Sequence, residues 1–389
     1  MMKRLVLIAL LLASPSALAQ ELTQYTAVRV QKANELAQGE QLKEAITLLK
    51  EIDTSRAYDK AFIARMLAVF YWQDGNTKQA ISKMEYAVES GLLRDEQAWI
   101  SQRMLADLYL NDQQFAKALK HYYQLVKSVP ETQKALDLWL RIAQSHYQLG
   151  QWEKVVTAID KYLQVEKNDF IQPLSLKLSA QLELKRWGAA IPTLELLISL
   201  QPEKLGWWRQ LVSLQMKVGR DKEALDTLAL AKVNGLSLSQ GDRRMLAQMY
   251  AKRGIPERAA IEISELEEAQ TDVQLLSEQA TYWQLAKEWD KSLFIWKLAA
   301  ERDAKYYWSV AQIMVQQGYY KDSLAVLDKV KGRDADVALA KTRALYKLNL
   351  LEKALVQAKR ANNIEPSSQA KSWIKYLSQL RTAAQQTTG

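Results

Sequence analysis

The chain has 389 residues, of which 48% are hydrophobic and 25% charged, and it contains no cysteine. Disulfide bonds, thiolate metal sites and cysteine nucleophiles are therefore excluded, and 13 glycines with 7 prolines are too few for an all-β chain rich in turns. The formal net charge of +9 comes from interspersed acidic and basic residues, a pattern typical of a solvated helical surface rather than of a nucleic-acid interface.

Residues 1 to 19 have the three parts of a secretory signal peptide. Lys3 and Arg4 form a basic start, an apolar run covers residues 5–12, and residues 17–19 read Ala-Leu-Ala, a cleavage site. This run is far shorter than the about 20 residues that span a bilayer, and no cysteine follows it for lipid attachment. We expect cleavage before Gln20, a net charge of +7, and a soluble protein in the periplasm of a Gram-negative bacterium, with no transmembrane segment.

A small residue then recurs along the chain at intervals of 31 to 38 residues. Glycine stands five residues before it in half of the copies, as at Gly75 and Gly219, and an aromatic or apolar residue stands three before it in most. This pattern indicates two closely packed helices joined by a tight turn. The ten small positions are Ala45, Ala80, Ala118, Val155, Ala190, Ala224, Ala259, Ser292, Ser323 and Ala354.

The repeated pattern resembles the tetratricopeptide repeat family, whose period is about 34 residues. The resemblance covers residues 27 to 366 and departs from the family where Glu40 replaces the turn glycine and where Ser292 and Ser323 replace alanine. It implies an all-α, right-handed solenoid of about ten helix–turn–helix repeats over residues 20 to 366. In residues 367 to 389 we expect a capping helix that ends near Leu380, followed by a frayed polar tail.

The sequence shows no catalytic or metal-binding pattern. His121 and His146 are the two histidines, and neither has the spacing of a zinc motif or of a catalytic triad. No glycine-rich phosphate loop is present. We therefore expect no enzyme activity, no metal and no cofactor. The acidic stretch from Glu262 to Glu268 is interpreted as a solvated helix face.

The 12 tryptophans fall into two groups. Seven occur at repeat positions and are assigned to the core: Trp139, Trp152, Trp187, Trp208, Trp283, Trp289 and Trp296. The other five are candidate ligand contacts: Trp72, Trp99, Trp207, Trp308 and Trp373. Three of these, Trp72, Trp99 and Trp308, would serve an alternative function in glycan binding.

The family resemblance implies that the first helix of each repeat lines a concave binding groove. Basic residues recur on these helices: Arg65, Arg103, Arg209, Lys217, Arg244, Lys252, Arg343 and Lys347. Ser213 and Gln248 lie between the basic residues of the sixth and seventh repeats, and Trp72 and Trp308 occupy groove positions. The set resembles the basic clamps with which some family members hold a peptide carboxylate, although the usual Asn is missing. The alternative is that these basic residues are ordinary solvent-exposed side chains of the helices and bind no ligand.

The sequence thus predicts an exported scaffold that binds a partner protein or peptide segment of the envelope, either acidic or ending in a C-terminal carboxylate, and no nucleic acid. Within the family, the layout of signal, repeats and no cysteine is similar to periplasmic repeat proteins found with TonB–ExbB–ExbD energy-transducing complexes. That similarity implies TonB, ExbB or ExbD as partners. The alternative function is glycan binding in export or envelope assembly.

Overall fold

A computed structural model describes residues 22–165 and 170–387, and the predicted signal peptide and its cleavage site lie outside these residues. The described part of the chain consists of helices, one of them a short 3-10 helix, and contains no strand. Within it, no helix is both long enough and apolar enough to cross a membrane.

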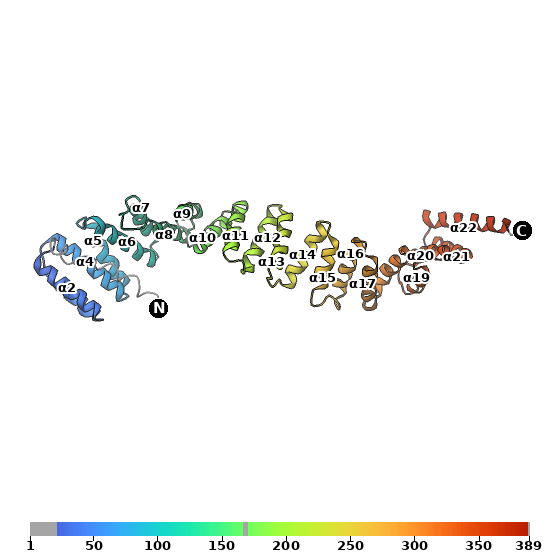
Figure 1. Cartoon of the computed structure of the whole chain (residues 1–389), viewed down its shortest axis with the longest axis horizontal. Helices are drawn as coiled ribbons and strands as arrows, with labels where there is room; N and C mark the ends of the chain where they lie inside the picture. Colours follow the sequence, from blue (N-terminus) through green and yellow to red (C-terminus); the bar gives the residue numbers. More distant parts are fainter. Residues whose placement is uncertain (1–21, 166–169, 388–389) are drawn as a thin grey trace. The chain divides into compact units, whose positions relative to one another are not determined.

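The helices form ten pairs, which divide between two compact units with the boundary between Gln201 and Pro202 (Figure 1). The first unit contains α2 (Gln24–Gln38) with α3 (Leu42–Lys50), α4 (Ala57–Gln73) with α5 (Thr77–Glu89), α6 (Asp95–Asn111) with α7 (Phe115–Leu125), α8 (Leu136–Gln148) with α9 (Trp152–Val165), and α10 (Ile171–Glu183) with α11 (Trp187–Leu200).

The second unit contains five further pairs, a 3-10 helix η2 (Ala304–Tyr306) and a final helix α22 (Ser368–Thr387). Its pairs are α12 (Leu205–Lys217) with α13 (Asp221–Val233), α14 (Gln240–Lys252) with α15 (Pro256–Ser264), α16 (Val273–Leu285) with α17 (Trp289–Arg302), α18 (Tyr307–Gln316) with α19 (Tyr320–Leu327), and α20 (Asp334–Lys347) with α21 (Leu351–Ile364).

The small position of every repeat is completely buried, at 0% exposure in all ten copies. In α5, Ala80 lies on one face together with Ile81, Met84 and Ala87, at the spacing of an amphipathic helix. On the preceding helix, Ala68 is also completely buried. Small side chains at these positions allow the two helices of a pair to approach closely, as the sequence predicts.

The turn between the paired helices has the same backbone conformation in all ten repeats. The residue five before the small position has a φ between 55° and 87° in each copy, which is the left-handed region. Glycine occupies this position in five copies, as predicted. The other five copies place residues with a Cβ there: Glu40, Gln113, Lys185, Lys287 and Asn349. The turn is therefore set by the packing of the pair and does not require glycine.

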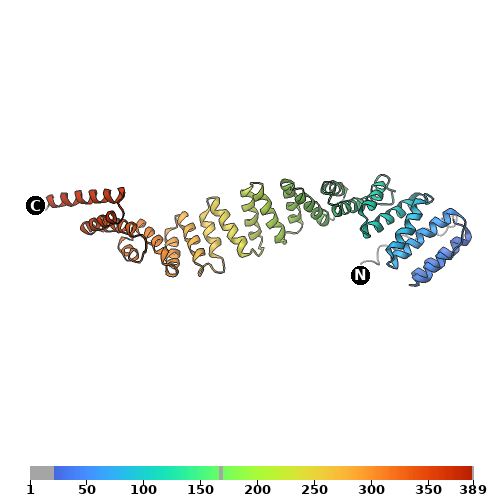
Figure 2. The same ribbon diagram turned by 180° about the vertical axis from the view of Figure 1, so that it is seen from behind.

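Within each unit, the pairs follow one another in chain order, and the second helix of one pair packs against the first helix of the next, as α15 does against α16 (Figure 2). Ion pairs also join helices of the same kind in adjacent repeats. Arg209 of α12 binds Asp242 of α14, both on first helices, and Lys232 of α13 binds Glu262 of α15, both on second helices. This two-layer stacking of pairs confirms the predicted all-α solenoid.

Two expectations about exposed segments are corrected. Glu262 is buried and its carboxylate accepts two hydrogen bonds of 2.8 Å from Lys232 Nζ, so this residue is not part of a solvated face. The capping helix is present and buries Ala370 and Leu377, but α22 continues to Thr387. The predicted end of this helix near Leu380 is therefore wrong.

Candidate functional site

All twelve residues predicted for the binding groove lie on first helices. They are Arg65 and Trp72 on α4; Arg103 on α6; Arg209, Ser213 and Lys217 on α12; Arg244, Gln248 and Lys252 on α14; Trp308 on α18; and Arg343 and Lys347 on α20. The structure brings the residues of α12 and α14 together in adjacent repeats of the second unit. We call the exposed side chains of α12, α14 and α16 the first-helix face.

Arg209 makes the best-defined contact on this face. Its Nε and Nη2 donate hydrogen bonds of 3.0 and 2.6 Å to the two oxygens of Asp242. Asp242 also accepts hydrogen bonds from the backbone N–H and the hydroxyl of Ser239, and so closes the capping box at the start of α14. The Asp242 side chain is only 9% exposed, whereas that of Arg209 is 46% exposed.

The electrostatics of this pair favour the charged state of both groups. Burial acts against the ionised carboxyl of Asp242, but the hydrogen bonds from Arg209 and Ser239 outweigh it and hold the pKa of Asp242 below its usual range. The hydrogen bond to Asp242 raises the pKa of Arg209. Arg209 therefore supports the fold by fixing the start of the next first helix.

The same connection recurs between other first helices. Arg244 Nη2 lies 3.1 Å from Glu278 Oε2 on α16, and Arg103 Nη2 lies 3.1 Å from Asp137 Oδ2 on α8. Each acidic partner follows its arginine by one repeat length, 34 residues in these two cases. This spacing of arginine and acid is visible in the sequence, but the positions of the basic residues alone do not reveal it.

The remaining first-helix arginines differ from this pattern. Arg65 donates from Nε to Ser101 Oγ at 3.1 Å, and burial lowers the pKa of its guanidinium. Arg343 lies eleven residues before its small position Ala354, whereas Arg209 lies fifteen before Ala224. Arg343 is thus about one helical turn nearer the end of its helix.

Most of the basic side chains that the sequence predicts to converge on α12 and α14 are paired with acidic side chains. Arg209, Arg244 and Lys252 have acidic partners in Asp242, Glu278 and, on α13, Asp221. Ser213 and Gln248 are exposed between them, as predicted. The first-helix face therefore presents alternating charge and neutral hydrogen-bonding groups, and it is not a strongly basic clamp.

The tryptophans proposed as ligand contacts do not form an aromatic surface. Trp99 is buried and its indole N–H donates to the carbonyl of Leu125 at 3.3 Å, so its prediction as a ligand contact is wrong. Trp72 packs against the core cluster of the first unit. Trp308 has the guanidinium of Arg333 5.6 Å from its ring centre. These environments fit packing better than sugar stacking.

Trp373 and Trp207 have neighbours of their own. Trp373 joins Tyr346 and Tyr376 in an aromatic cluster where α22 meets α20, with ring centres 5.5 to 6.2 Å apart. The hydroxyls of the two tyrosines lie 2.8 Å apart. Trp207 lies beneath the ammonium of Lys204 at 4.7 Å. Trp373 therefore secures the capping helix, as the apolar face of that helix in the sequence predicts.

One apolar hollow was not anticipated from the sequence. It has a volume of about 400 Å³ and lies between α16 and α17. Its lining residues are Trp283, Asp290, Lys291, Phe294 and Ile295. Phe294 is 61% exposed and Lys291 covers the ring of Trp283 at 4.5 Å, so the hollow is open and shallow.

The two histidines occupy structural positions. His146 is buried, and its ring nitrogens lie 2.7 Å from the Tyr123 hydroxyl and 2.7 Å from Gln151 Oε1. Burial lowers the pKa of both His146 and His121. Among the residues described, no group of acidic or histidine side chains is arranged to hold a metal ion.

No protein-family model and no curated protein matches the sequence. Among solved structures, the chain is similar to Naa15/Naa10 bound to HypK-THB, with 15% identity, a TM-score of 0.41 and 93% of this chain covered. The match spans 61% of that longer chain. A second is the C-terminal part of a TPR repeat-containing protein from Cytophaga hutchinsonii, with 16% identity, a TM-score of 0.40, and 71% and 95% of the two chains covered.

A third similar structure is the TPR2AB domain of yeast Sti1 in complex with an HSP90 peptide, with 15% identity and a TM-score of 0.32. The match covers 66% of this chain and 98% of the Sti1 chain. Scores at this level assign neither a partner nor a function. The assignment of the fold therefore rests on the helix pairs described above.

Proposed function

We propose that the protein is an exported scaffold that binds an extended segment of a partner protein along the first-helix face. One observation carries the proposal: adjacent first helices are locked side by side by arginine–acid pairs, and between these pairs they expose hydrogen-bonding groups in register. Ser213 and Gln248 lie 35 residues apart on α12 and α14, and Lys217 and Lys252 are separated by the same spacing.

The chemistry of this face favours a segment with acidic groups or a terminal carboxylate. Arg209 uses Nε and Nη2 for Asp242, and within the described chain no residue accepts a hydrogen bond from its Nη1. The side chains of Arg209 and Arg244 are both 46% exposed. A ligand carboxylate can therefore bind the outer edge of either guanidinium while the pair to the next helix stays intact.

The cellular location and the partner complex are proposed from the sequence. Residues 1 to 19 support export to the periplasm, because they have a basic start, an apolar run and an A-x-A end. The layout of signal, repeats and no cysteine is similar to that of repeat proteins found with TonB–ExbB–ExbD complexes. This similarity supports an accessory role in such an envelope complex. TonB, ExbB and ExbD are therefore the first partners to test, by cross-linking of the exported protein in intact envelopes.

The binding chemistry is tested with short acidic peptides that carry either a free or an amidated C-terminus. We expect the full chain to bind the peptides with a free C-terminus more tightly than the amidated ones. The affinity should fall as the salt concentration rises, because exposed charges are screened over roughly 8 Å at physiological ionic strength. Equal affinity for free and amidated peptides would exclude the terminal carboxylate as the recognised group, and no binding by either would contradict the proposal.

A further inference from the structure

The net charge of the chain is concentrated at its C-terminal end. Residues 21 to 336 contain 42 basic and 42 acidic residues, whereas residues 337 to 389 contain nine basic and two acidic residues. The helices α20, α21 and α22, which pack together at the end of the second unit (Figure 1), carry nine basic and three acidic residues, an excess of +6.

Most of these basic side chains have no acidic partner among the residues that the structure describes. Lys341 pairs with Asp328, and Arg381 lies 3.9 Å from Glu352. The other seven basic side chains are exposed, and none has an acidic partner within the described residues: Arg343, Lys347, Lys353, Lys359, Arg360, Lys371 and Lys375. This differs from α12 and α14, where arginine is paired with acid of the next repeat.

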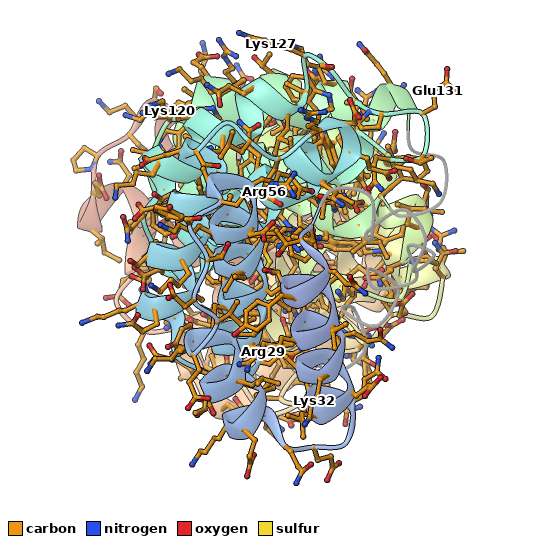
Figure 3. The ribbon with its side chains drawn as sticks, turned by 90° about the vertical axis from the view of Figure 1, so that its left-hand side faces the viewer. Arg29, Lys32, Arg56, Lys120, Lys127 and Glu131 are labelled. Carbon is orange, nitrogen blue, oxygen red and sulfur yellow. The ribbon has the colours of Figure 1, made fainter. Side chains whose placement is uncertain are left out.

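The first unit provides a contrast in the distribution of its charges. Figure 3 shows Arg29 and Lys32 on α2, and Lys120 and Lys127 at some distance from them near α7. Arg56 is near the buried Asp59, at 3.9 Å, and Arg29 covers the ring of Tyr25 at 4.7 Å. Basic residues of that unit are thus dispersed among acidic ones.

The outer face of α21 combines the basic charge with exposed apolar side chains. Its buried face consists of Ala354, Leu355, Ala358 and Ala361. At helical spacing on the opposite side, Lys353, Val356, Arg360 and Ile364 form one stripe, in which Val356 is 61% and Ile364 47% exposed. We call these four residues the α21 stripe.

We propose that the C-terminal end of the protein docks on an anionic phospholipid bilayer, with the α21 stripe against the headgroups. A helix face that alternates base with apolar side chains fits the boundary between lipid headgroups and acyl chains. Juxtamembrane lysines and arginines are attracted to anionic lipid. Such docking is peripheral, consistent with the finding that no described helix is long and apolar enough to cross a membrane.

The distribution of charge favours lipid over two other anionic partners. The seven exposed basic residues come from three helices, so a fluid array of mobile headgroups can adapt to them, whereas a folded acidic protein needs its charges at matching positions. Binding of single-stranded nucleic acid would use aromatic side chains for base stacking. The aromatic side chains here, Tyr346, Trp373 and Tyr376, are instead packed against one another.

The test is sedimentation of the full chain with vesicles of phosphatidylcholine alone or of phosphatidylcholine mixed with phosphatidylglycerol. We expect binding only to the anionic vesicles, and its loss at high salt. The double variant Lys353→Glu, Arg360→Glu should reduce binding at least about tenfold, because each basic residue near an anionic surface contributes about a fivefold factor. Replacement of Val356 and Ile364 by serine should cause a smaller, severalfold loss.

A matched control is available on α3, where Lys43 and Lys50 are exposed and have the same spacing of seven residues. The variant Lys43→Glu, Lys50→Glu changes the net charge by the same amount and should bind anionic vesicles like the unaltered protein. Equal loss in both double variants would overturn the proposal, as would equal binding to neutral and anionic vesicles. Tighter binding to polyglutamate or to duplex DNA than to anionic vesicles would assign the surface to one of those partners and would also overturn it.

Discussion

The two units are built from the same repeat and both join adjacent repeats by ion pairs, such as Arg103 with Asp137 in the first unit, but their most buried polar contacts differ. In the first unit, the buried carboxylate of Asp59 joins α4 to α2 by accepting hydrogen bonds from the hydroxyls of Thr23 at 2.7 Å and Thr26 at 2.8 Å. In the second, Lys232 of α13 binds both Glu262 and Glu265, and Arg243 of α14 binds Glu265.

This difference teaches that the repeat determines where helices lie but not which polar groups join them. The small positions and the left-handed turns recur in all ten pairs. The polar contacts occur in particular repeats only. We therefore expect substitutions at repeat positions to have similar effects in both units, and substitutions of polar contacts to have effects that depend on burial.

The largest effect is expected for Asp59→Ala in the first unit. The side chain is completely buried, and its loss leaves the hydroxyls of Thr23 and Thr26 without their acceptor. We expect destabilisation by about 2–3 kcal/mol, typical of unsatisfied buried polar groups. Urea unfolding followed by circular dichroism measures it. The exposed Asp328, which pairs with Lys341 in the second unit, is the control, and Asp328→Ala should change stability little.

The small position should be equally intolerant of bulk in the two units. Ala80→Leu and Ala224→Leu should each destabilise the protein by about 1–3 kcal/mol, because the larger side chain forces the paired helices apart. The exposed Ala57 provides the control, with Ala57→Leu close to neutral. Denaturant midpoints that remain unchanged in either variant would show that the position is not packed as described.

Opposite substitutions at the shared turn position should change stability in opposite directions. Gly219 has a φ of 76° and open space around its Cβ position, so Gly219→Ala should cost about 1 kcal/mol through backbone strain alone. Gln113 has a φ of 61° at the equivalent turn, so Gln113→Gly relieves strain and should stabilise by up to about 1 kcal/mol. Thermal unfolding of both variants compares them, and the same sign for both would contradict the shared geometry.

The smallest effect is a difference in pH response. Burial lowers the pKa of His146 in the first unit, so its neutral form stabilises the fold above the unfolded value of about 6.5, and this contribution is lost as the pH falls below it. The second unit contains no histidine, and the lowered pKa of Asp242 makes its contribution fail only at pH values below about 4. As the pH is lowered, hydrogen exchange measured by mass spectrometry should rise first in the first unit. This rise should be smaller in the variant His146→Gln.

The sequence predicts the helix pairs of the backbone in more detail than it predicts the side-chain contacts. The spacing of residues such as Ala80 and Ala224 identified all ten helix pairs, because a fixed period reports directly on stacked units. The sequence does not identify Gln113 and Lys185 as left-handed turn residues, since side-chain type does not reveal a conformation imposed by packing. It also does not reveal that Arg209 is paired, because its partner Asp242 lies one repeat away.

The location of the proposed binding site also depends on contacts between repeats. Arg209→Glu is a poor probe of binding, because it would place a second carboxylate beside Asp242 and disturb the capping box of α14. Ser213 and Gln248 are exposed, so their replacement by glutamate adds negative charge to the first-helix face without breaking an ion pair.

The central claim is that this face binds an acidic segment, and titration calorimetry with an acidic peptide that has a free C-terminus tests it most directly. The variant Ser213→Glu, Gln248→Glu should bind at least about tenfold more weakly, a loss of about 1.4 kcal/mol, with an unchanged circular dichroism spectrum. The control Asn234→Glu, Ser264→Glu adds the same charge at the ends of α13 and α15, in the second-helix layer, and should bind like the unaltered protein. Equal affinity in the two double variants would contradict the account.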